Sequence, residues 1–474
     1  MRVTAQLAGL IGLASLLACA SFVETPIWER PPPPIRDSRV VEPGKLHRFE
    51  LDNGLLLIVL EDHRLPRVSL GIELRRGAAS VGSDRAGLAG FTAELMKRGA
   101  GDRDAFELAS AVDALGSAFS MRADWDSITA QIWGLTRDLD SMLEILGDVV
   151  LRPRFDEEEA TRARGELLAA IERATADPNY LERRFAAAAL YPGVRAGLPL
   201  SGIPETVAAL DSAAAREFHA QMFVPNNAIF FASGDLDASE LLDRVGAVFG
   251  AWPAGEVPDP GPPLPAPTPT ERRILIVDRP DLTQARITLA HEGISRAHPD
   301  RIAAGLLNEA IGGSGFSSRL MQRVRADAGL TYGVSSRFSM HRGGGTFAVA
   351  TFTRVAEVRT VIDLLLTELE RARREPPAGM ELEEMRALQV GQFALGIETS
   401  DAVLGSLVNL DVYGLPEDSL DTYRSRVRAV TAADVGRLAL ELMHPDRAAI
   451  VLVGPADALV PQLQDLGPVE VIRP

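Results

Sequence analysis

The sequence predicts an α+β fold made of two similar halves, each a mainly antiparallel sheet covered by helices, which face each other around a cavity. With 474 residues the chain is too long for one ordinary hydrophobic core, and 46% apolar content is enough to fill more than one. A proline-rich stretch, 254–271, is expected to be a linker between two domains. Strands and helices are predicted in the same order on either side of it, which indicates an internal duplication.

The first half, 45–253, contains patterns of both strands and helices. Apolar residues alternate from Val68 to Leu74, so this segment is expected to be a strand with one buried face. Asp104 and Gly116 flank an apolar helical pattern as start and stop signals. Strands are predicted at 55–60, 68–74, 117–123, 127–135 and 228–233, and helices at 88–98, between 104 and 116, at 139–150, within 156–222 and ending at 249.

The second half, 272–474, repeats this order of elements. The ends of the two halves also match, because Val-Pro-Asn-Asn-Ala at 224–228 corresponds to His-Pro-Asp-Arg-Ala at 444–448. Strands are predicted at 274–277, 286–291, 332–338, 346–352 and 448–453, and helices at 302–311, at 317–328 and within 355–443.

The N-terminus is predicted to be an export signal followed by a tether. Residues 1–18 have the positive start and apolar run of a signal peptide, and the run is too short to span a bilayer permanently. The Leu-Leu-Ala-Cys sequence ending at Cys19 resembles the bacterial lipobox, so Cys19 is the predicted site of lipid attachment to a membrane. Residues 19–44, with four consecutive prolines, are then an extended tether. The alternative is a cleavable signal with an incidental cysteine.

Charge and motif content exclude several function classes. The net charge of −16 disfavours nucleic acid as a partner, because binding a polyanion requires a basic surface. The glycine-rich turn at 312–315 lacks the Gly-Lys-Ser/Thr ending that a phosphate-binding loop needs. A serine or cysteine hydrolase is equally unsupported, since no Gly-x-Ser-x-Gly motif occurs and the only cysteine is Cys19.

Four short stretches carry a resemblance to a known family. The stretches are Leu-Asp-Asn-Gly-Leu at 51–55, Gly-Leu-Ala-Gly-Phe at 87–91, Gly-Gly-Ser-Gly-Phe-Ser-Ser-Arg-Leu at 312–320 and Gly-Leu-Thr-Tyr at 329–332. In this order and spacing, inside a duplicated chain, they resemble the pitrilysin family of zinc peptidases, which includes insulinase and the mitochondrial processing peptidase, over residues 49–472.

The resemblance implies where a zinc site would lie in the first half. Active members use His-x-x-Glu-His, in which two histidines hold Zn²⁺ and the Glu is the general base, and a Glu on a later helix is the third ligand. Alignment places Gly90 at the first histidine, Ala93 at the base, Glu94 at the second histidine and Ala170 at the third ligand. One carboxylate cannot hold zinc, so the chain is expected to bind no metal and to have no catalytic residues of its own. A site assembled from distant histidines is the open alternative.

The resemblance also implies a substrate-binding pair in the second half. Family members have an Arg and a Tyr seven residues apart that position the scissile peptide and stabilise charge on its carbonyl oxygen. Arg325 and Tyr332 match this spacing, and a guanidinium and a phenol are suitable donors for an oxyanion. The alternative is that Arg325 is a solvated helix residue and Tyr332 packs at the edge of a strand.

A degenerate zinc site beside an intact Arg/Tyr pair suits a non-catalytic, peptide-binding subunit of a heterodimeric zinc metallopeptidase. The expected partner is a homologous chain that carries His-x-x-Glu-His and zinc, to which Arg325 and Tyr332 would contribute in trans. The expected location is the periplasmic side of a bacterial envelope, and Ala20 after the cysteine favours the outer membrane, by resemblance to bacterial lipoproteins. A stand-alone peptide-binding or scaffold lipoprotein is the alternative function, and an autonomous zinc peptidase would require stoichiometric metal.

Overall fold

The computed structural model describes most of both halves and half of the linker 254–271. The predicted signal peptide, the lipid attachment site Cys19 and the prolines at 31–34 lie outside the described residues. Within the described part, no helix is long and apolar enough to cross a membrane. The described residues are 39–257, 259–261, 264 and 271–473.

The first half forms a six-stranded sheet. In sheet order its strands are β1 (Leu46–Glu50), β2 (Leu56–Glu61), β8 (Ala228–Gly234), β3 (Arg67–Leu74), β7 (Ile128–Leu135) and β6 (Ala118–Ala123). Neighbouring strands are antiparallel except β2 and β8, which are parallel. Ile72 of β3 lies opposite Ala130 of β7 and Phe230 of β8, so the alternation in sequence places the apolar residues of three strands on one face.

The second half forms a sheet with the same core topology. In sheet order its strands are β14 (Val469–Ile472), β9 (Arg273–Asp278), β13 (Ala449–Gly454), β10 (Gln284–Glu292), β12 (Gly344–Arg354) and β11 (Val334–His341). The order β9-β13-β10-β12-β11 repeats β2-β8-β3-β7-β6, and the β9–β13 pair is parallel like β2–β8. The halves differ at one edge, where β1 is antiparallel to β2 and β14 is parallel to β9.

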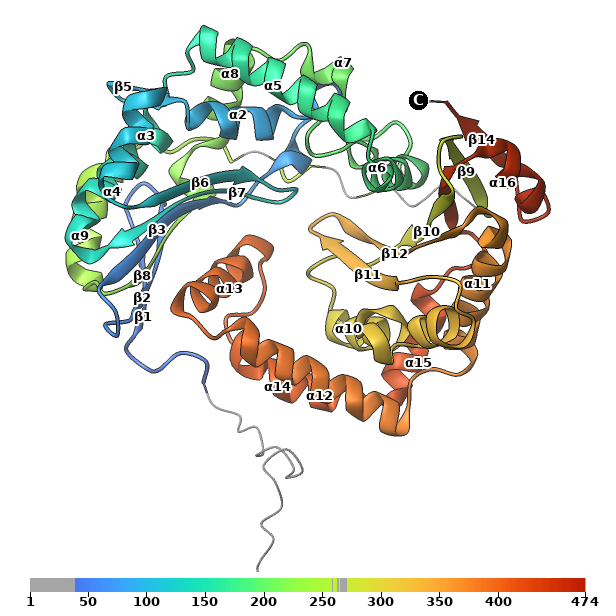
Figure 1. Ribbon diagram of the computed structural model, residues 1–474. Helices are drawn as coiled ribbons and strands as arrows, with labels where there is room; N and C mark the ends of the chain where they lie inside the picture. The colour runs from blue at the N-terminus through green and yellow to red at the C-terminus, as the bar shows by residue number, and fades with distance from the viewer. Residues whose placement is uncertain (1–38, 258, 262–263, 265–270, 474) are drawn as a thin grey trace, which may run out of the picture. The chain divides into compact units, whose positions relative to one another are not determined.

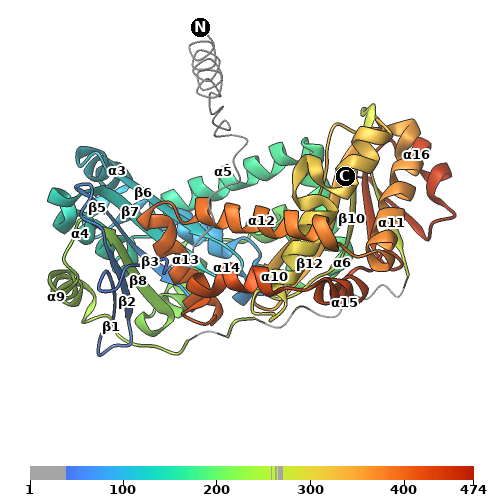
Figure 2. The same cartoon turned by 90° about the horizontal axis from the view of Figure 1, so that it is seen from below.

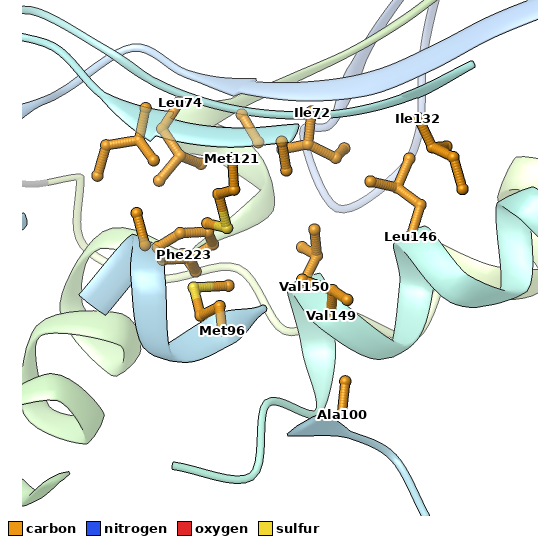
Figure 3. Close-up of a cluster of buried hydrophobic side chains, with 14 of the residues drawn as sticks. Ile72, Leu74, Met96, Ala100, Met121, Ile132, Leu146, Val149, Val150 and Phe223 are labelled. Atoms are coloured by element: carbon orange, nitrogen blue, oxygen red, sulfur yellow. The ribbon is translucent and has the colours of Figure 1, made fainter. Parts of the chain in front are cut away.

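Helices of the same half cover one face of each sheet, and the predicted α+β class is confirmed (Figure 1). In the first half, Met96 and Leu146 point from helices toward Ile72, Leu74 and Ile132 of the sheet (Figure 3). The helices of this half include α2 (Leu88–Met96), α3 (Ala105–Ala114), α4 (Leu139–Leu151), α5 (Glu157–Thr175), α7 (Pro204–Val207), α8 (Ser212–Met222) and α9 (Ala238–Phe249).

The second half has a corresponding helical layer. Figure 2 shows two of its helices, α12 and α14, side by side, and residues of these helices are in contact. The helices are α10 (Arg301–Asn308), α11 (Val358–Arg374), α12 (Gly379–Gly396), α14 (Ser419–Ala429), α15 (Ala432–Leu442) and α16 (Ala456–Leu463).

One helix of the first half packs on the sheet of the second half. Helix α6 (Pro178–Leu190) contacts β9, β10 and β13, and its Leu181 is buried against Val277 and Val453. The buried Glu182 carboxylate accepts a hydrogen bond at 2.6 Å from Nε of Arg286 on β10. This ion pair and the apolar contacts join the two halves.

In the same way, one helix of the second half packs on the sheet of the first half. Helix α13 (Ser400–Tyr413) occupies the corresponding place in the order of elements and packs on β2 and β8 of the first sheet. Its Leu404 and Val408 form a cluster with Ile58 and Phe231. Each sheet is therefore covered on its second face by a helix from the other half, an exchange that the sequence did not predict.

Candidate functional site

Helix α2 carries three of the four positions at which the resemblance places zinc chemistry. Gly87 starts the helix with φ of +101°, and a Cβ there would lie 2.8 Å from the carbonyl oxygen of Ser201, so only glycine fits. Leu88 and Phe91 face the core and fix the rotation of the helix.

The three positions on α2 cannot form a metal site. Gly90 has no side chain and Ala93 has only a buried methyl group, so neither side chain offers a lone pair. The remaining carboxylate, Glu94, already pairs with Nζ of Lys97 at 2.6 Å and with Nη2 of Arg98 at 3.0 Å. The donors present do not match the three protein ligands of a catalytic zinc ion.

Helix α5 carries the fourth position, Ala170, which is exposed and has no ligand atom. An arginine joins α5 to α2 instead. Arg98 reaches Glu166 at 2.5 Å and Glu159 at 3.5 Å, while also bonding to Glu94. The hydrogen bond and charge of Arg98 lower the pKa of Glu166. A guanidinium with three carboxylate partners thus connects the two helices on which the family's zinc ligands would lie.

The histidines provide no substitute site. His63 contacts Asp235 at 2.8 Å, His219 contacts the Val150 carbonyl at 2.8 Å, and His341 contacts Asp126 at 3.3 Å. In the described ranges, no group of three His, Cys, Asp or Glu side chains is placed to hold a metal ion. The expectation that the chain binds no metal stays a prediction.

The predicted Arg/Tyr pair is brought together in the second half. The Cζ atom of Arg325 lies 4.9 Å from the ring centroid of Tyr332 and 4.4 Å from that of Phe316. Tyr332 is 77% exposed and Phe316 is 70% exposed. Among the described residues, no ion pair or hydrogen bond holds the Arg325 side chain. Arg325 therefore presents an unpaired cation between two exposed aromatic rings.

The local backbone explains how Arg325 and Tyr332 are held. Arg325 lies in a π-helical segment, η9 (Met321–Asp327), a rare geometry that often occurs at functional sites. The loop that carries Tyr332 is anchored to β12 on both sides. Thr353 donates a hydrogen bond to the Leu330 carbonyl at 2.6 Å, and Thr351 donates to the Gly333 carbonyl at 2.9 Å.

A neighbouring arginine has a different environment. Arg319 donates two hydrogen bonds to Glu381, at 2.7 and 2.6 Å, and a third to the Glu375 carbonyl at 2.8 Å. These bonds occupy its guanidinium and tie the segment to α12. Arg319 is a structural ion-pair partner, whereas Arg325 is available to a ligand.

Sequence reasoning missed two residues at these sites. Phe316 is the second ring against Arg325, and its signal was a large apolar residue next to a glycine-rich turn. Arg98 is the centre of the carboxylate cluster, and its signal was the spacing of four residues after Glu94.

Comparison with known families agrees with this architecture. A model of the insulinase family of peptidases, family M16, matches residues 57–202, and a model described as the peptidase M16 inactive domain matches residues 209–388. The chain belongs to the M16 peptidase family. The family predicted from the sequence stretches is confirmed.

The relatives of this M16 chain include peptidases and inactive domains. An uncharacterized zinc protease of Streptomyces coelicolor is 26% identical over 420 residues, which cover 87% of this chain and 90% of the relative. A crystal structure of a peptidase M16 inactive domain from Pseudomonas fluorescens is 25% identical with a TM-score of 0.80, and the match covers 86% of this chain and 98% of that one. The periplasmic protease PqqL from Escherichia coli is 16% identical with a TM-score of 0.72, covering 88% of this chain and 48% of PqqL.

Proposed function

We propose that this M16 chain is a non-catalytic, peptide-binding subunit of a heterodimeric zinc peptidase of the bacterial envelope. The partner is a homologous chain that carries His-x-x-Glu-His and the zinc ion. Arg325 and Tyr332 of this chain bind the peptide and stabilise negative charge on its scissile carbonyl oxygen in trans.

The observation that carries this proposal is the unpaired guanidinium of Arg325. Aromatic rings on two sides hold it in place without neutralising its charge. The half-buried guanidinium of Arg325 and the exposed phenol of Tyr332 can donate hydrogen bonds to one carbonyl oxygen. Arg319, six residues before Arg325, is paired with Glu381, so the absence of an ion-pair partner is specific to Arg325.

The first half supports the non-catalytic part of the proposal. Gly90, Ala93 and Ala170 provide neither ligand nor base, and Glu94 is engaged by Lys97 and Arg98. The similarity of residues 209–388 to an inactive M16 domain points in the same direction.

Attachment to the envelope is the second part of the proposal. The lipobox-like sequence before Cys19 would place a lipid anchor at the start of the mature chain, and residues 19–44 would extend from it. The periplasmic location named for PqqL, a structural neighbour, supports an envelope protein.

The first experiment is gentle purification of the intact protein from its native membrane, followed by mass spectrometry of stoichiometric partners. Recovery of a homologous His-x-x-Glu-His chain supports the heterodimer. Repeated recovery of this chain alone contradicts the heterodimer and supports the stand-alone peptide-binding lipoprotein.

The second experiment tests the role of Arg325 in the purified complex. Arg325→Ala should reduce peptide cleavage by about 100-fold, the effect of losing one oxyanion donor, with folding and partner binding intact. Arg323→Ala is the matched control, because Arg323 is in the same segment, is 49% exposed and pairs with Asp327. An unchanged rate for Arg325→Ala excludes the role in trans.

A further inference from the structure

The second face of the first sheet is polar on two of its strands. On β3 and β7, the polar residues between the core positions are Ser69, Glu73, Thr129 and Gln131. Most of the corresponding residues of β2 and β8, such as Ile58, are apolar and pack under α13. Polar side chains on an interior face are the informative exception in a packed protein, so this area needs a separate explanation.

These polar residues line a cavity of about 330 Å³. Helix α13 forms another wall through Asp401, Gly405 and Tyr413, and His341 at the end of β11 closes it from the second half. The cavity lies on the sheet face opposite α2, which packs with the core residues of β3 (Figure 1). It is thus separate from the degenerate zinc positions.

Carboxylates dominate the charges in this cavity, and three of the four contact an arginine or histidine side chain. Glu73 is the fourth, and it forms no ion pair in the described part of the chain. The three pairs are Asp124 with Arg122 at 3.0 Å, Asp126 with His341 at 3.3 Å, and Asp401 with Arg67.

Glu73 is the group whose charge the protein leaves unmatched. Burial raises the pKa of its carboxyl group, although the charge of Arg122 opposes that shift. The side-chain oxygen of Thr129 is buried at the cavity wall and has no hydrogen-bond partner among the described residues. A cation entering beside Glu73 would remove the cost of ionising the carboxylate.

We infer that this cavity binds a primary ammonium group, with Glu73 as its counter-ion. The ammonium has three donors, and the cavity offers acceptors in Glu73, Ser69 and Thr129. The group is carried by a small amine or by the amino terminus of a short peptide, and the volume is within the range of small-ligand sites.

The binding test is calorimetric titration of the full-length protein with two matched pairs of probes. Cadaverine is compared with neutral 1,5-pentanediol, and triglycinamide is compared with neutral N-acetyl-triglycinamide. Binding of cadaverine or triglycinamide with Kd below about 1 mM, and none of the neutral partner, supports the site. Cadaverine alone identifies a small amine as the source, and triglycinamide alone identifies a peptide terminus. Absence of binding by both, or equal binding by the neutral partners, overturns the inference.

Two variants place the binding in this cavity. Glu73→Gln should weaken binding of the positive probe by about 30-fold or more, since the partner charge is lost. Asp113→Asn is the control, because Asp113 is an exposed carboxylate of α3 outside the cavity. Unchanged affinity of a folded Glu73→Gln protein overturns the assignment of the counter-ion.

Gly405→Leu tests the cavity without removing any polar group. A Cβ at Gly405 meets nothing within 4 Å, and Gly405 lines the cavity, so the new side chain fills space rather than displacing neighbours. Replacing glycine within a helix should leave the protein at least as stable. Loss of probe binding with retained stability supports the site, and retained binding overturns it. Neither result depends on the peptidase partner, so failure here is distinct from failure of the proposed function.

Discussion

Two arginines of this M16 chain, Arg98 and Arg325, have opposite environments. Arg98 lies among Glu94, Glu159 and Glu166, and its side chain is 16% exposed. Arg325 lies between the rings of Phe316 and Tyr332 and has no carboxylate partner in the described ranges. The charge of Arg98 is paired within the chain, whereas the charge of Arg325 is left unpaired and is available to a ligand. The difference is one of charge pairing: Arg98 is a structural contact between two helices, whereas Arg325 has the free guanidinium that the proposed peptide-binding role requires.

The largest expected effect is the restoration of zinc binding in the first half. The variant Gly90→His/Ala93→Glu/Glu94→His/Ala170→Glu restores the family's ligands on helices that Arg98 already connects. We expect one zinc ion per chain by metal analysis, because histidines four residues apart share a helix face. Free zinc at 1,000 times Kd should stabilise the folded variant by about 4 kcal/mol.

A triple variant that keeps Ala93 is the matched control for this prediction. It should bind zinc but lack the general base. A comparison of peptide cleavage by the two variants therefore separates metal binding from general-base catalysis. If neither variant takes up zinc, α2 and α5 no longer have the spacing of a metal site. The backbone of the first half, and not only four side chains, would then be unsuited to holding zinc.

Substituting Arg98 or Arg325 by alanine in the isolated chain should lower stability by different amounts. Arg98→Ala should lower the free energy of unfolding by about 2 kcal/mol, because it leaves three carboxylates without a shared partner. Arg325→Ala should lower it by less than about 1 kcal/mol, since only exposed ring contacts are lost. Urea unfolding measures both. Equal losses would remove the distinction between a structural and an available arginine.

Local patterns in the sequence predict the strands and most helices because each has one face in its own half's core. The alternation from Val68 to Leu74 therefore identified β3. The exchange of α6 and α13 was not predictable in this way, since periodicity shows that a face is apolar but not which sheet covers it. Val469–Ile472, strand β14, was also missed because its residues are only partly buried and too few for a clear pattern.

Of the candidate site residues, those within a sequence motif were predictable, and those brought together by tertiary packing were not. The resemblance placed Arg325 and Tyr332 at a matching spacing, and the structure brings their side chains together. Phe316 could not be assigned from the sequence, because its contact with Arg325 depends on the π-helical turn η9. The cavity at Glu73 depends on α13 from the other half, so no local pattern identifies it.

Acid should distinguish the two arginines by a smaller effect. Arg98 lowers the pKa of Glu166 below 4.5, so the associated stability is present above that pH and is lost as the pH falls through the lower folded value. The difference in unfolding free energy between wild type and Arg98→Ala should therefore become smaller at acidic pH. The corresponding difference between wild type and Arg325→Ala should stay constant, because no carboxylate of the described part pairs with Arg325. Urea unfolding at a series of pH values down to 3 checks both.

The smallest expected effects on stability come from the two rings beside Arg325. Tyr332→Phe keeps the ring contact and removes only an exposed hydroxyl, so the unfolding free energy should change by less than about 0.5 kcal/mol. In the complex, the same change should lower the cleavage rate by about tenfold or more, since one donor to the carbonyl oxygen is lost. Phe316→Leu should have a weaker effect on the rate, because Arg325 keeps its charge and the Tyr332 ring. If Tyr332→Phe changed stability but not cleavage, the second-half pair would be structural, like the cluster around Arg98.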